Sequence, residues 1–139
     1  GDSLPEAIGT DLDGSFGQAP GTDSEGAATL VSIAGDSFDA TSPFAAESYD
    51  AAALILLAMQ AAGSKNPADY KGKVFDVANA PGVETLPGEL AKGMEILASG
   101  GEIDYVGASN VELIGAGESA GNYREITIKD AKISVDRYR

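Results

Sequence analysis

A run of nine consecutive apolar residues, 51–59, limits what this chain can fold into more than any other feature. The run lies between Ser42-Pro43, a typical helix start, and Gly63, a typical helix end. The pattern predicts a helix that is apolar on every side, and such a helix is stable when protein covers most of its faces. Because a chain of 139 residues has little protein left to surround it, we expect the full molecule to be larger.

The apolar run does not predict a membrane span, because a spanning helix needs about twenty apolar residues. The chain has no initiator Met and no basic segment ahead of an apolar stretch, so no targeting signal is expected within it. Its opening residues, Gly1 to Pro5, are typical of a loop that is entered from an earlier segment. We therefore expect a processed chain or a fragment.

Composition excludes several classes of function. The 22 acidic and 9 basic residues give a net charge of −13, which repels phosphate, so we expect no nucleic-acid partner. The chain contains no His and no Cys, which excludes a disulfide, an ordinary zinc site and a Ser-His or Cys-His pair. Sites for hard cations built from oxygen ligands stay open on these grounds alone. The apolar fraction of 43% and a mean hydropathy of −0.06 are typical of a soluble globular protein.

The charges are distributed unevenly along the chain. Residues 1–64 hold ten acidic side chains and no Lys or Arg, whereas five of the nine basic residues lie between Arg124 and Arg139. The two ends therefore belong to different structural bodies or attract each other. The simpler alternative is an acidic face that keeps the surface hydrated.

Hydrophobic periodicity predicts alternating helices and strands. A capping box, Thr22 to Glu25, opens a helix that Gly35 ends, and a pair of strands flanks Asp130-Ala131. The other expected elements are extended segments at 14–19, 104–106 and 111–114, and helices at 67–78 and 87–99. This order favours an α/β architecture with a small β appendage at the C-terminus.

Three short motifs suggest chemistry but are better explained as turns. Ser119 lies in a G-x-S-x-G string, yet no His is present and a strand, not a helix, is expected to follow. The overlapping G-x-G-x-x-A string at 115–120 also precedes a strand, which argues against a dinucleotide site. Residues 11–14 resemble the start of a calcium loop but lack its later ligands. We expect no catalytic residue, no metal and no cofactor.

Several segments resemble one family. Residues 44–55 and 61–64 resemble the long helix of the type I periplasmic binding proteins, and in particular the branched-chain amino acid receptors of ABC importers. Residues 101–113 are similar to the segment that closes the second helical block of that family, and the resemblance extends from about Asp2 to Arg139. Residues 110–114 depart from it, because the family often has glycine and Phe-Asp there. Family members are more than twice as long, so the chain resembles their C-terminal portion.

The resemblance implies a fold of two Rossmann-like α/β lobes joined by three crossover segments, with this chain contributing to both lobes. Residues 1–48 would form part of the C-terminal lobe and residues 49–121 part of the N-terminal lobe. Residues 122–139 would be a crossover and the strands that return to the C-terminal lobe. The absent N-terminal part of the protein would be the partner of this portion.

The resemblance also implies a function without chemistry, so the chain is not expected to be an enzyme. The resemblance implies that the protein is the extracytoplasmic, periplasmic substrate-binding component of an ABC importer. It also implies that the protein is made as a precursor with a signal peptide. Such a protein binds a small amino-acid-like ligand in the cleft between its lobes and presents it to the membrane permease. Leucine-like amino acids, other amino acids, amides and small aromatic acids all stay open as ligands.

The family pattern suggests site residues in two places. Asp2, with Ser3 and Leu4 beside it, lies near the position of the acid that takes the ligand ammonium group, and Tyr49 and Asp50 lie at a crossover, where they would serve as hinge residues. Three alternatives remain: a receptor domain of the same fold that signals, a self-contained acidic interaction domain, and a hydrolase that uses Ser119. Undiminished turnover in a Ser119→Ala variant would exclude the last.

Overall fold

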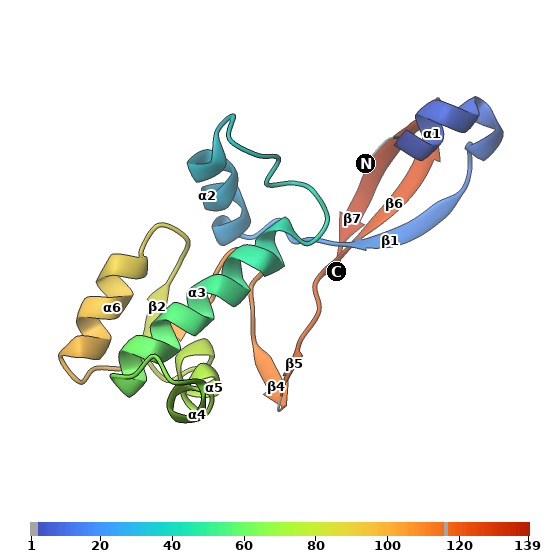
Figure 1. Ribbon diagram of the computed structural model, residues 1–139. Helices are drawn as coiled ribbons and strands as arrows, with labels where there is room; N and C mark the ends of the chain where they lie inside the picture. Colours follow the sequence, from blue (N-terminus) through green and yellow to red (C-terminus); the bar gives the residue numbers. More distant parts are fainter. Residues whose placement is uncertain (1–2, 116) are drawn as a thin grey trace.

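The computed structural model describes residues 3–115 and 117–139. Helices and strands alternate along it as an α/β fold requires (Figure 1). The elements are α1 (Ser3–Ile8), the 3₁₀ helix η1 (Gly9–Leu12), β1 (Phe16–Pro20), α2 (Glu25–Ala34), α3 (Ala45–Ala62), α4 (Pro67–Tyr70), α5 (Lys73–Ala78), β2 (Val83–Thr85), α6 (Leu90–Ala98), β3 (Ile103–Tyr105), β4 (Leu113–Gly115), β5 (Glu118–Ser119), β6 (Tyr123–Lys129) and β7 (Lys132–Tyr138).

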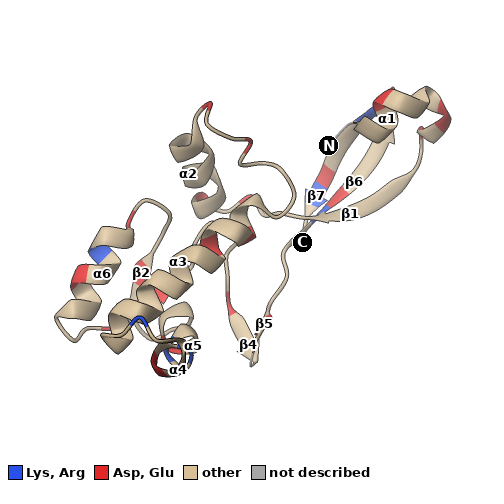
Figure 2. Ribbon diagram, in the orientation of Figure 1, with Lys and Arg blue, Asp and Glu red and all other residues tan. Residues whose placement is uncertain are grey.

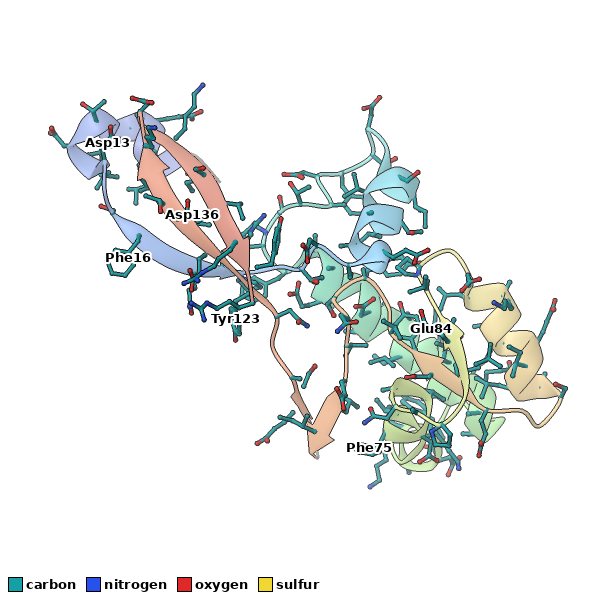
Figure 3. All side chains as sticks on the ribbon, turned by 180° about the vertical axis from the view of Figure 1, so that it is seen from behind. Asp13, Phe16, Phe75, Glu84, Tyr123 and Asp136 are labelled. Atoms are coloured by element: carbon teal, nitrogen blue, oxygen red, sulfur yellow. The ribbon has the colours of Figure 1, made fainter. Side chains whose placement is uncertain are left out.

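These elements form two bodies that meet at a narrow junction (Figure 1). The sheet body, residues 3–20 and 123–138, contains α1, η1 and an antiparallel sheet of order β1-β6-β7. The helical body, residues 25–115, contains α2 to α6 and the parallel pair β2-β3. Figure 3 shows the sheet body extending from Asp13 near η1 to Tyr123 near the junction.

The C-terminal hairpin predicted from the alternating pattern is confirmed. Strands β6 and β7 pair with Lys129 opposite Lys132, and both turn residues, Asp130 and Ala131, have positive φ angles of 52° and 57°. The Asp13 carboxylate accepts hydrogen bonds from the backbone N–H groups of these two residues, both at 3.0 Å. Residues 11–14 therefore end in a turn, and the Asp13 carboxylate in that turn holds the backbone of the hairpin turn in place.

The core of the helical body lies between α3, α5, α6 and the β2-β3 pair. Its buried members come from α3, α5 and β3, and apolar residues of α6 pack around them. They are Ala53, Leu54, Leu57, Ala58, Val77, Ala78, Ile103 and Tyr105. Strand β2 was not expected from the sequence, because it has three residues, too few to show an alternating pattern, and follows Pro81-Gly82 directly.

Helix α3 departs from its prediction in two ways. It begins at Ala45 instead of Pro43, and its N-cap is Phe44, with φ of 67°, instead of Ser42. The described residues cover the helix incompletely, as expected if the full molecule is larger, because Ile55 and Leu56 are 42% and 45% exposed. Only one side of the helix packs against α5 and α6, so part of the apolar run faces solvent.

Three other elements differ from the sequence prediction. The N-cap of α2 is Ser24, whose Oγ accepts from the Ala27 N–H at 3.1 Å, and not Thr22. The helix expected at 67–78 is divided into α4 and α5 around Gly72. Ser3 to Pro5, expected to belong to a loop, lie in α1, and residues 9–12 form η1. Local propensity cannot decide such cases, because a short helix depends on what it packs against.

One buried carboxylate organises the helical body. Asp50 is 1% exposed, and its oxygens accept hydrogen bonds from the Tyr105 hydroxyl at 2.9 Å, the Ala108 N–H at 2.8 Å, and the N–H and hydroxyl of Ser109 at 2.7 and 2.6 Å. We call these four residues the Asp50 hub. Burial, and then the nearby Asp50 carboxylate, raise the pKa of Tyr105, so its hydroxyl stays a donor. A buried charge with this many donors is stable where an unpaired one is not.

We expect a Gly107→Ala substitution to break the Asp50 hub. Gly107 has φ of +63°, and a Cβ there would meet an Asp50 oxygen at 2.4 Å. The matched control is Gly63→Ala, since Gly63 has φ of +60° and nothing within 4 Å of its Cβ position. The control should lose about 1 kcal/mol of unfolding free energy from backbone strain. Gly107→Ala should lose at least about 3 kcal/mol, measured by urea denaturation, because buried donors lose their acceptor. Equal losses would contradict this role of the hub.

The net charge predicts that salt stabilises the protein. Acidic residues are spread over both bodies in Figure 2, so they repel one another throughout the molecule. Raising NaCl from about 0.05 M to about 1 M shortens the screening length and weakens that repulsion. We expect the midpoint of thermal unfolding, followed by circular dichroism, to rise over this range. A midpoint that stays constant or falls would show that surface repulsion is unimportant for stability.

Candidate functional site

The chain passes between the two bodies through two segments that lie side by side. The Gly21 N–H donates to the Asn122 carbonyl at 3.1 Å. The Asn122 side-chain amide donates to the carbonyls of Ser109 at 2.9 Å and Asn110 at 3.4 Å, which belong to the helical body. These contacts bind the second segment to both the first segment and the Asp50 hub.

A cavity of about 330 Å³ opens at this junction and is lined by both bodies. Its walls are residues 20–24, one face of α2, residues 40–42, the start of α3 and two residues of the sheet, Arg124 and Tyr138. A second cavity, of about 420 Å³, lies between residues 39–43 and the sheet, and Arg124 lines it too. Cavities of this size between two bodies are typical binding sites for small molecules.

Arg124 reaches from β6 across the junction to the helical body. Its Nη2 donates to the Thr41 carbonyl at 3.0 Å, in the loop between α2 and α3. Its Nε is buried and has no hydrogen-bond partner within the part of the chain that the structure describes. A Cβ at Gly21 would lie 3.3 Å from the Arg124 Cδ, a tight contact, so glycine gives this side chain room there.

The loop that Arg124 contacts is ordered by Asp39. The Asp39 carboxylate accepts from the Thr41 hydroxyl and N–H, at 2.6 and 2.9 Å, and from the Ser42 hydroxyl at 2.9 Å. Hydrogen bonds from Thr41, and to a smaller extent Ser42 and the charge of Arg124, lower the pKa of Asp39. Because the pKa is lowered in the folded protein, this contribution to stability is present above the ordinary pKa and is lost as pH falls.

Phe44 follows this loop and is held in a strained conformation. Its φ of 67° lies in the left-handed region, which a bulky residue seldom adopts, and its side chain is 61% exposed. Burial therefore does not explain why an aromatic residue occupies this position. Strain of this kind clusters at ligand-binding positions, which makes Phe44 a candidate contact residue.

The structure separates the site residues that the sequence suggested. Asp2 lies outside the described residues. Ser3 and Leu4 begin α1 in the sheet body, where Leu4 is 58% exposed, and neither lines the two junction cavities. Tyr49 and Asp50 both lie in α3, where the Tyr49 hydroxyl accepts from the Gly88 N–H at 3.3 Å. Both belong to the helical body and not to the segments that cross the junction.

Sequence reasoning missed Arg124 and Phe44 as site residues. The sequence gives a weak indication that Arg124 is a site residue, because it is a charged residue at the start of a predicted strand. In that strand the apolar residues Ile126 and Ile128 alternate with polar ones. The sequence gives no indication that Phe44 is a site residue, because its backbone conformation depends on how the loop joins α3. Ser119 is exposed in β5, and its hydroxyl donates to the Ala120 carbonyl at 3.1 Å. The loop continues into β6, a strand, as expected for a turn and not for a nucleophile elbow.

Within residues 3–115 and 117–139, no group of three or more acidic, His or Cys residues is placed to hold a metal ion. Over the same ranges, no helix combines the length and apolar character that a bilayer span requires.

Comparison with known proteins identifies the fold. No family model matches the chain. The chain is 34% identical over 94 residues to a chemotactic signal transduction system substrate-binding protein, BasB, from Halobacterium salinarum, covering 67% of this chain and 23% of that protein. Its structure is similar to a leucine binding protein, LivK, from Thermotoga maritima, with a TM-score of 0.66 and 15% identity. That match covers 99% of this chain and 34% of LivK.

The chain has the type I periplasmic-binding-protein fold, as the sequence predicted, and spans about a third of the length of that structure. Both similar proteins are binding proteins, and the chain spans about a quarter of the length of BasB.

The strain at Phe44 can be measured with a matched pair of substitutions. Phe38 is also half exposed but is not among the positive-φ residues, so Phe38→Gly is the control for Phe44→Gly. Glycine accepts the left-handed region without cost, so Phe44→Gly should be about 1 kcal/mol more favourable than the control in urea denaturation. If Phe44→Gly and Phe38→Gly lower the free energy of unfolding equally, packing and not function accounts for an aromatic residue in the strained conformation of Phe44.

Proposed function

We propose that this chain forms part of a solute-binding protein that holds a small amino-acid-like ligand between two lobes. The observation that carries the proposal is a pair of cavities at the junction of two bodies, in a chain with the type I binding-protein fold. LivK is a leucine binding protein, which supports a leucine-like amino acid as the first ligand to test.

In this proposal the sheet body belongs to the C-terminal lobe and the helical body to the N-terminal lobe. The boundary expected after residue 48 moves to residues 21–24. Its support is the packing of α2, where the Ser24 hydroxyl donates to the Ala108 carbonyl at 3.4 Å and Leu30 is 1% exposed. A Cβ at Gly26 would meet the Gly107 carbonyl oxygen at 1.9 Å, so α2 lies directly against the Asp50 hub.

Further protein of the same two-lobed fold would complete the helical body. The parallel pair β2-β3 has two strands, whereas parallel sheets are normally larger and covered on both faces. The exposed side of α3, with Ile55 and Leu56, is a second surface that a larger lobe would cover. The chain spans 34% of LivK, which supports an additional segment of this kind.

The predicted residue roles are part of the same proposal. The Asp2 carboxylate would take the ligand ammonium group, whereas Ser3 and Leu4, which were predicted beside it, lie in α1 and line neither junction cavity. Tyr49 and Asp50 would act on the hinge indirectly, because the Asp50 hub holds Ser109, whose carbonyl accepts from Asn122 at the junction.

The ligand-bound form would be recognised outside the cytoplasm by a membrane protein, for which there are two candidates. One is the permease of an ABC importer, and the other is a receptor that signals. BasB is a substrate-binding protein of a chemotactic signal transduction system, which supports the second candidate. Neighbouring genes for a permease and an ATPase would favour the importer, and a neighbouring transducer gene would favour signalling.

Titration calorimetry of the chain with L-leucine and with D-glucose tests the proposed binding. We expect weak heat of binding for leucine, because part of the site would lie in the absent N-terminal part of the protein, and none for glucose. Asp2→Asn should weaken leucine binding about tenfold or more, because the ammonium group loses a charged partner. Asp11→Asn, which removes an exposed acid of η1, is the matched control and should bind as the parent does. Absence of binding by leucine, isoleucine, valine and other amino acids would refute the proposal.

A further inference from the structure

We infer that Arg124 binds the carboxylate of the ligand in the 330 Å³ junction cavity. This inference rests on the proposed function and specifies its ligand as a small apolar molecule with one carboxylate. Three independent observations support it: the pairing of the arginines, the unpartnered donor of Arg124, and the chemical character of the cavity wall.

Arg124 differs from the other arginines in its partners. The chain has three arginines, and two of them, Arg137 and Arg139, both pair with the carboxylate of Glu125. No carboxylate of the described residues lies within 4.0 Å of the Arg124 guanidinium nitrogens. In a chain with 22 acidic residues, the arginine at the junction is therefore left without an ionic partner among those residues.

The hydrogen bonds of Arg124 are also incomplete. A guanidinium carries five N–H donors in a planar fork, and the fork matches the two oxygens of a carboxylate. The described residues supply Arg124 with the Thr41 carbonyl and leave its buried Nε–H without an acceptor. Arg124 lines the cavity, so an anion bound there could pair with its guanidinium, and a charged group with incomplete hydrogen bonds gains from such a partner.

The cavity wall limits what the rest of the ligand can be. Ala27, Leu30 and Val31 give the α2 side an apolar wall. Asp23 and Glu47 line the same cavity, so a second carboxylate on the ligand would be repelled. The combination favours a monocarboxylate with a short branched or straight apolar chain and disfavours dicarboxylates and phosphorylated compounds.

The side-chain Nε–H of arginine gives a direct test by nuclear magnetic resonance. With ¹⁵N-labelled arginine the chain shows three such signals, and Arg124→Gln identifies the one from Arg124. The probes are L-leucine, 4-methylpentanoate, which lacks the ammonium group, and 3-methylbutylamine, which lacks the carboxylate. We expect both carboxylates to shift the Arg124 signal and to leave those of Arg137 and Arg139 unchanged. The amine, and sodium chloride at the same ionic strength, should leave the Arg124 signal in place.

Affinity measurements on variants complete the test. Arg124→Gln should weaken 4-methylpentanoate binding about 10- to 100-fold, and Arg124→Lys should weaken it less, because lysine keeps the charge but loses the planar fork. Arg137→Gln, which removes an exposed arginine paired with Glu125, is the matched control and should bind as the parent does. The backbone amide spectrum of each variant shows whether it is folded.

The outcomes separate this inference from the proposed function. If leucine binds but the Arg124 signal does not move, or Arg124→Gln binds equally well, the inference is wrong and the solute-binding proposal stands. If 4-methylpentanoate shifts the Arg124 signal and no amino acid binds, the carboxylate site is real and the amino-acid proposal fails. If chloride shifts the signal as strongly as the carboxylates do, the site holds an adventitious ion only and the inference is overturned.

Discussion

The hydrogen bonds to the Asp50 carboxylate determine how the rest of the molecule is arranged. A buried charge requires several donors at once, and these come from the Tyr105 side chain and from the backbone and hydroxyl groups after it. Satisfying them fixes α3 against the end of β3 and leaves no space for a side chain at Gly107. The same contacts determine where the chain leaves the helical body on its way to the junction.

From the Asp50 hub a short series of contacts reaches the sheet body. The Ser109 carbonyl accepts from the Asn122 side chain, and the Asn122 carbonyl accepts from the Gly21 N–H. Gly21 then makes room for the Arg124 side chain, which reaches the loop before α3. A junction built from two chain segments and a few polar contacts is compatible with movement of one body relative to the other, which is the default for bodies that share little apolar contact.

Most of the fold could be predicted from local patterns, and the failures have physical causes. The hairpin around Asp130-Ala131 was predicted because alternating residues and a turn determine it locally. The helix at 67–78 divided around Gly72, and the start of α3 moved to Ala45, because short-range propensity is weaker than packing at such positions. Strand β2 has three residues and forms because it pairs with β3. A local sequence pattern does not contain this pairing.

The sequence by itself determined the α/β class, the acidic surface, the absence of His and Cys chemistry and the apolar character of α3. Each of these depends on residue type or on short-range spacing. Only the tertiary structure decided that Asp50 is a buried acceptor, that Arg124 lacks a carboxylate partner among the described residues, and that two cavities lie between the bodies. These features join residues more than fifty positions apart, and such partners are brought together by packing and not by local preference.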